Sequence, residues 1–159
     1  MMIKKYQRTH ELTKSENLVY IAQPMSAYQR KAYNVILKAT LDQLLEKPKR
    51  ALFELSLFKY KKMLNFNKDS MKIDELTRPL ESLMSMQLLM YRKGGKNGAS
   101  LLSQYDLDLT KRTLKWEMAT SIKRMLLNDR FIVLELPIIN SIKSSYGIAL
   151  YEHLKTKKH

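Results

Sequence analysis

The longest helical pattern in the sequence covers residues 27–46, and its apolar positions form two stripes. The first stripe contains Ala32, Val35, Ile36 and Ala39, and the second contains Tyr33, Leu37, Leu41, Leu44 and Leu45. An apolar arc that wide predicts a helix buried on more than one side. Ser26 is a good N-cap, because its hydroxyl can accept a hydrogen bond from a first-turn amide, and Pro48 ends the helix.

A short apolar run at 52–57 and a basic amphipathic segment at 57–66 follow, and a polar break at 67–70 ends them. The basic segment predicts a helix with Leu57, Tyr60 and Leu64 on its inner face. Its lysines then lie on the outer face, toward solvent or a partner.

A second helix is predicted from about Lys72 to Met86, after the polar break. Its apolar positions are Ile73, Leu76, Leu80 and Leu83. This spacing lines one face of a helix. Pro79 lies inside the segment, so the helix either is kinked there or starts near Thr77. The uninterrupted apolar spacing favours the kink.

The pattern then changes to β-type runs at 88–92, 101–109 and 114–118. Residues 93–98, rich in glycine, join the first two runs, and the short polar link 110–113 joins the last two. The order helix, short turn, helix and basic hairpin is the plan of a winged helix-turn-helix. The predicted fold class is therefore α+β, mostly helical, with a small antiparallel β-hairpin wing.

The ends of the chain complete the predicted domain. Residues 120–127 predict a short helix, 131–134 a strand or extended entry, and a last helix runs from Pro137 to about Lys157. Residues 1–16 are polar and predict a flexible N-terminal arm. The remaining residues, 17–159, predict a single winged-helix domain.

The net charge of the chain indicates the kind of partner it binds. The 159 residues contain 29 Lys and Arg against 15 Asp and Glu, for a net charge of +14. The excess is spread along the chain: 10 minus 4 in residues 1–50, 9 minus 5 in 51–100 and 10 minus 6 in 101–159. Such a body favours a polyanionic partner, and the alternative is a solvated, lysine-rich surface.

The predicted second helix carries Asp74, Glu75 and Glu81, whereas cations cluster beside it. We therefore expect phosphate contacts to outweigh base readout. The predicted DNA-binding residues are Lys59, Lys61, Lys62, Lys68, Lys72, Arg78, Arg92, Lys93, Lys96, Lys111 and Arg112.

Nothing in the sequence supports catalysis, a metal site or a cofactor. His10, His153 and His159 are dispersed, and no glycine-rich phosphate loop of the Gly-x-x-x-x-Gly-Lys type occurs. Asp106 and Asp108 alternate on one strand face without a third ligand. The chain has no cysteine, no signal-peptide pattern and no apolar run of membrane-spanning length, so we expect a cytoplasmic protein without a membrane partner.

Three separated stretches resemble the replication initiator proteins of iteron-type plasmids, the RepB/RepE-like group. They are Asn17-Leu-Val with Met25-Ser26 and Gln29-Arg30, then Ser100-Leu-Leu-Ser103 with Tyr105-Asp106, and last Ser145-Tyr146 with Leu150-Tyr151-Glu152 and Leu154-Lys155. Their order and spacing cover nearly the whole chain. The chain is thus similar to the N-terminal winged-helix domain of this family.

The resemblance implies partners as well as a fold. Family members typically carry two winged helices: the C-terminal one makes most sequence-specific contacts with origin repeats, and the N-terminal one supports dimerisation and adds backbone contacts. It implies double-stranded DNA at origin repeats, a homodimer, and a host replication initiator or helicase as partners. The second winged helix is absent from this sequence, so we expect either an excised fragment or a short stand-alone member.

Two alternatives remain at this point. One is a winged-helix transcription regulator that binds a single operator as a dimer. The other is a purely protein–protein dimerisation module, in which β-type edges at 131–134 and 52–55 pair across a twofold axis.

Overall fold

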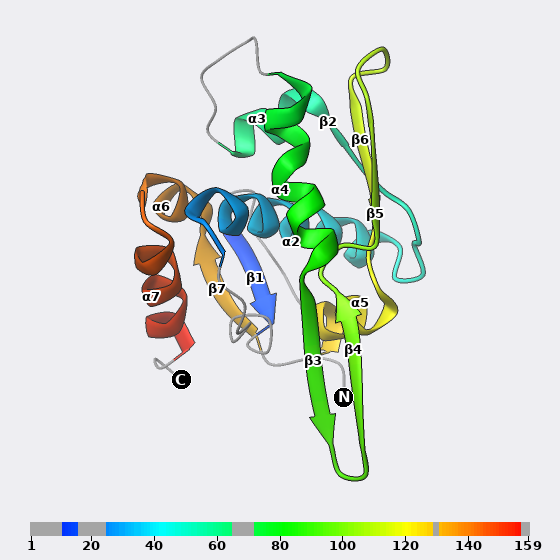
Figure 1. Ribbon diagram of the computed structural model, residues 1–159, viewed down its shortest axis with the longest axis vertical. Helices are drawn as coiled ribbons and strands as arrows, with labels where there is room; N and C mark the ends of the chain where they lie inside the picture. The colour runs from blue at the N-terminus through cyan, green and yellow to red at the C-terminus, as the bar shows by residue number, and fades with distance from the viewer. Residues whose placement is uncertain (1–10, 16–24, 65–71, 129–130, 157–159) are drawn as a thin grey trace.

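The computed structural model describes residues 11–15, 25–64, 72–128 and 131–156 (Figure 1). The elements, in chain order, are β1 (Glu11–Ser15), α2 (Ala27–Glu46), β2 (Phe53–Ser56), α3 (Leu57–Met63), α4 (Ile73–Ser85), β3 (Gln87–Arg92), β4 (Gly95–Ser100), β5 (Gln104–Asp108), β6 (Thr113–Glu117), α5 (Thr120–Asn128), β7 (Phe131–Glu135), α6 (Leu136–Ser141) and α7 (Ser145–Thr156). This mixture of helices and small antiparallel sheets confirms the predicted α+β fold class.

Helix α2 is the centre of the core, and α4, α5, α7, β1 and β2 pack around it (Figure 1). Its start is a capping box: Ser26 Oγ accepts the Gln29 amide at 3.1 Å, and Gln29 Oε1 accepts the Ser26 amide at 2.8 Å. All residues from Ala32 to Leu41 are buried, which confirms a helix covered on more than one side.

Strand β2 pairs with β6, and β6 with β5, in a three-stranded antiparallel sheet. Trp116 of β6 is 1% exposed and stacks on Phe53 of β2, with ring centroids 6.1 Å apart. Its indole Nε1 donates to Thr40 Oγ1 on α2 at 2.8 Å. This sheet therefore rests on the central helix through a buried aromatic pair with a satisfied polar group.

The glycine-rich link is shorter than predicted. Only Lys93 and Gly94 form the turn, and Gly95–Ser100 is strand β4, paired with β3 in a separate two-stranded sheet. Gly94 has a φ of 80°, which a residue with a side chain rarely adopts. The predicted strand over 101–109 is correct only from Gln104 to Asp108. Gly and Asn disfavour strands by propensity, but backbone pairing with β3 overrides that preference here.

Helix α4 starts at Ile73 and continues through Pro79, so the alternative start near Thr77 is wrong. Helix α3 ends at Met63 with Leu64 as its C-cap, and the predicted extension to Phe66 lies outside the described residues. Leu76, Leu80 and Leu83 of α4 are buried at the predicted spacing, whereas Ile73 is 45% exposed.

Part of the predicted flexible arm is instead a strand. Glu11–Ser15 forms β1, which pairs antiparallel with β7 from Glu11↔Glu135 to Ser15↔Phe131. The local sequence does not indicate this strand, because its residues are mostly polar and its partner lies more than a hundred positions away. Residues 1–10 and 16–24, including the Asn17-Leu-Val stretch of the resemblance, lie outside the described part of the chain.

The predicted last helix is two helices, α6 and α7, separated at residues 142–144. Ser144 Oγ accepts the Gly147 amide at 3.0 Å, so Ser144 is the N-cap of a new helix. A Cβ at Gly147 would lie 2.8 Å from Ile142 Cγ2, so the close approach at this corner favours glycine. The prediction missed the break because the apolar spacing continues across it.

Candidate nucleic-acid interface

Helix α3 and the turn between β5 and β6 meet at one end of the molecule. We call this turn, residues 109–112, the wing turn. The Leu57 amide donates to the Arg112 carbonyl at 2.9 Å, which ties the first residue of α3 to the turn. Asp108 Oδ1 accepts the Lys111 amide at 2.9 Å, and Arg112 has a positive φ of 52°. Asp108 is therefore a turn-forming residue, and its carboxylate shapes the wing turn.

The lysines of α3 lie outside because Leu57 and Tyr60 face the core, whereas Phe58 of the same helix is 77% exposed. Ser56 caps the helix by accepting the Lys59 amide at 3.1 Å. Tyr60 is 1% exposed, and its hydroxyl donates to the Leu76 carbonyl of α4 at 3.4 Å. Burial raises the pKa of Tyr60 far above its usual value. With Tyr60 fixed inside, Lys59 and Lys62 are exposed and Lys61 is half-buried.

Five cations on α3 and the wing turn form a surface that we call the basic end. Its members are Lys59, Lys61 and Lys62 of α3 and Lys111 and Arg112 of the wing turn. Lys111 and Arg112 are both exposed. About fifty residues separate the two segments in sequence, so the fold brings them together. Helix α3 itself contains no carboxylate to offset its charge.

The exposed face of α4 has the opposite character. Lys72 at its N-cap and Arg78 are exposed, but so are Asp74, Glu75 and Glu81. Two positive charges against three negative charges leave this face slightly acidic. The two first-turn carboxylates suit the positive end of the helix dipole. Lys72 and Arg78 are therefore isolated cations on a slightly acidic face of α4.

The predicted cations of the first hairpin lie elsewhere. Lys93 and Lys96 are exposed at the tip of the β3–β4 hairpin, and Arg92 ends β3. In Figure 1 this hairpin extends away from the C-terminal end of α4, while α3 and the wing turn lie near its N-terminal end. The predicted footprint is therefore divided into two regions. Lys68 lies outside the described residues.

Lys115 of β6 lies within the sheet and belongs neither to the basic end nor to the first hairpin. Its cross-strand partners are Glu54 on β2 and Asp106 on β5. Directly opposed residues share one face of the sheet, so two carboxylates flank this ammonium. Asp106 therefore lies opposite a lysine of the same sheet.

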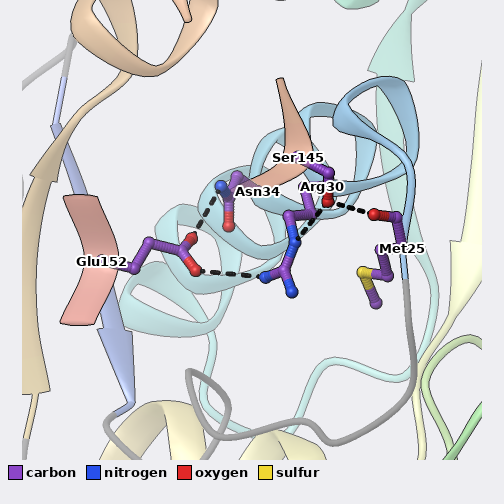
Figure 2. A network of polar contacts seen from close by, with 5 residues as sticks. All are labelled: Met25, Arg30, Asn34, Ser145 and Glu152. Atoms are coloured by element: carbon purple, nitrogen blue, oxygen red, sulfur yellow. Dashed lines mark hydrogen bonds and ion pairs between the residues drawn. The ribbon is translucent and has the colours of Figure 1, made fainter. Parts of the chain in front are cut away.

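A polar network that we did not predict joins α2 to α7, and Figure 2 shows its five residues. Arg30 Nε donates to Ser145 Oγ at 3.2 Å, and Ser145 Oγ donates to the Met25 carbonyl. The Glu152 carboxylate accepts Asn34 Nδ2 at 3.1 Å and lies 3.6 Å from the Arg30 guanidinium.

Sequence did contain a signal for this network. Arg30, Ser145 and Glu152 are among the residues that carry the resemblance described above. The structure assigns them to fold maintenance, because Glu152 is fully buried and Arg30 is largely covered. A pattern of residue types could not indicate which of them pair.

Within the described ranges, no group of three His, Cys, Asp or Glu side chains is arranged to hold a metal ion. In the same part of the chain, no helix combines the length and the apolarity needed to cross a lipid bilayer.

Comparison with known proteins identifies the family. The profile of the family described as initiator replication protein, WH1, matches residues 11–155. No curated protein shows a significant match. The matched range includes the paired strands β1 and β7, the central helix, both hairpins and the network of Figure 2. It confirms the resemblance to the winged-helix domain of plasmid replication initiators. The chain belongs to the family of initiator replication proteins and carries their WH1 domain.

Proposed function

We propose that this chain is a non-enzymatic DNA-binding domain of a plasmid replication initiator, and that its basic end contacts the phosphate backbone of double-stranded DNA at origin repeats. The observation that carries the proposal is the hydrogen bond between the Leu57 amide and the Arg112 carbonyl, at 2.9 Å. It holds two cationic segments side by side on a rigid corner. A cluster of lysine and arginine on one corner is the electrostatic footprint of a nucleic-acid-binding protein.

The charges of α4 support phosphate contacts over base contacts. A helix that reads base edges lies deep in the major groove, where carboxylates meet a strongly negative potential. Asp74, Glu75 and Glu81 are exposed on α4 and disfavour that position. Phosphate contacts set position and affinity without sequence information. We therefore propose that this domain alone discriminates weakly between duplex sequences.

Self-association is the second part of the proposal, and the pairing of the strands restricts where it can occur. β7 pairs with β1 along its whole length, which occupies one of its two edges. β2 pairs with β6 on one side, and on the other Gln43 bonds the Glu54 backbone twice. We propose a homodimer that does not use the edge of β2. A host initiator or helicase is the further protein partner that we propose.

A titration tests the proposal. The unmodified protein is titrated into a labelled duplex that carries a repeated site and into a scrambled duplex of the same length, at several salt concentrations. We expect similar affinity for both and a log–log salt slope of about −0.9 per phosphate contacted. Absence of binding to either duplex at low salt would refute the DNA-binding function. A strong preference for a single unrepeated site would favour the transcription regulator.

A further inference from the structure

The β3–β4 hairpin is a second basic surface, distant from the basic end. Residues 87–100 contain Arg92, Lys93 and Lys96 and no Asp or Glu. Lys93 and Lys96 are exposed at the tip, which we define as residues 92–96. No carboxylate within the hairpin offsets this charge.

The base of the hairpin is anchored to the domain. Leu88 is 7% exposed, and the Leu101 amide donates to the Met86 carbonyl at 3.0 Å, which closes the strand pair against the domain. Among the described side chains beyond that point, Leu89 is 47% exposed, and Lys93 and Lys96 are exposed. A two-stranded ribbon has little stability by itself in water. Because the tip carries exposed cations away from the core, an extended partner can reach it.

Helix α4 separates the two basic surfaces. The Tyr60 hydroxyl bonds the Leu76 carbonyl, which places α3 against the first turns of α4, and β3 begins directly after α4 ends. Thirteen helical residues span about 20 Å, and six strand residues span about another 20 Å. Figure 1 shows the hairpin continuing away from α4, so the two surfaces lie roughly 35–40 Å apart.

That separation is close to one turn of B-form DNA, about 34–36 Å. Two contacts one turn apart lie on the same face of a straight duplex. The α4 face between them carries Asp74, Glu75 and Glu81 against Arg78, so its charge disfavours close phosphate contact in the middle. A straight, regularly charged partner fits this alternation of positive, slightly negative and positive surface.

We infer that the domain holds duplex DNA at two places about one helical turn apart, with the basic end on one backbone segment and the β3–β4 tip on another. This inference rests on the proposed DNA-binding function and adds a minimum duplex length to it. At about 3.4 Å per base pair, both contacts require roughly 12 base pairs, and a shorter duplex reaches only one of them.

Duplex length is therefore the variable to test. The unmodified chain and a Lys93→Ala/Lys96→Ala variant are titrated into duplex stems of about 8 and about 20 base pairs, each closed by a short loop so that the shorter stem stays paired. We expect the unmodified chain to bind the long stem more tightly, with a salt slope steeper by about 2. We expect the variant to lose that gain and to bind the short stem normally.

A Lys59→Glu/Lys62→Glu variant serves as the counterpart, because it should weaken binding to both stems. Equal affinity of the hairpin variant and the unmodified chain for the long stem would overturn the inference. So would a loss of the same size on both stems, since the tip would then belong to the same contact as the basic end. Failure of the unmodified chain to bind either stem would instead overturn the proposed function. Matching unfolding midpoints confirm that each variant is folded.

Discussion

The carboxylate of Glu152 on α7 lies 3.6 Å from the guanidinium of Arg30 on α2. The carboxylate is fully buried, so this pair and the bond from Asn34 at 3.1 Å hold the C-terminal helix on the central one. More than a hundred residues separate the partners in sequence. The ion pair therefore closes the domain by linking its last helix to its longest one.

Glu152→Ala should destabilise the fold strongly, because it leaves a largely buried guanidinium and the Asn34 amide without their acceptor. Removal of one partner of a buried ion pair costs about 3–5 kcal/mol. Glu152→Gln should cost less, since its amide oxygen can still accept from Asn34. Urea unfolding measures both, with exposed Lys143→Ala as the control. Equal stability of the Ala variant and the unmodified chain would show that the pair does not hold α7.

Thr40→Val should lower the free energy of unfolding by about 1–3 kcal/mol, because it leaves the buried indole N–H of Trp116 without its acceptor. Val has nearly the same shape, so the packing around it changes little. Thr40→Ser keeps the hydroxyl and is the matched control, which should recover most of the loss. The measurement is urea unfolding followed by tryptophan fluorescence, which reports directly on this residue. A Val variant as stable as the unmodified chain would show that the bond from Trp116 to the Thr40 hydroxyl does not stabilise the fold.

Gln43→Ala should increase self-association through the edge of β2. The Gln43 amide donates to the Glu54 carbonyl at 2.9 Å and accepts the Glu54 amide at 3.1 Å, so it occupies the outward backbone groups of an edge strand. Unprotected edges pair with other chains. Light scattering over a concentration series should show larger species for the variant. An unchanged mass distribution would mean that the edge needs no such protection.

Stability should fall in alkaline solution above about pH 10, the ordinary pKa of tyrosine. Burial, with the charge of Glu75 adding to it, raises the pKa of Tyr28 to about 12, and burial raises those of Tyr33 and Tyr60 further. The folded state thus keeps protons that the unfolded state releases, so stability is present below pH 10 and is lost as pH rises. Tyr28→Phe should show a shallower fall between pH 10 and about 12 in unfolding experiments. A fall of unchanged steepness would assign it to the other tyrosines.

Sequence periodicity was sufficient for the elements that bury a regular apolar face. The long helix α2, the helix α4 and the short helix α5 all lie where the spacing predicts them. Local capping chemistry was also readable, as the Ser26–Gln29 capping box shows. Two elements escaped because strand pairing decides them: β1 depends on the distant β7, and β4 on the adjacent β3.

For the same reason, the sequence predicts only part of the candidate interface. The lysines of α3 stand out in the sequence because helical spacing separates them from the core positions. That Arg112 lies beside Leu57, whereas Lys93 lies at the far end of α4, depends on which hairpin pairs with β2. No local pattern contains that information.

Charge reversal at the basic end tests the central claim most directly. Lys59→Glu/Lys62→Glu changes two exposed side chains of α3, and Lys47→Glu/Lys49→Glu changes two exposed side chains after α2. Each pair lowers the net charge by four, from +14 to +10, so the two variants are matched in total charge. Affinity for a duplex of about 20 base pairs is measured by fluorescence anisotropy at fixed salt.

We predict that the α3 variant weakens binding at least about tenfold and that the control pair changes it much less. Equal losses in the two variants would mean that total charge alone attracts DNA, and would contradict a defined contact surface at α3 and the wing turn.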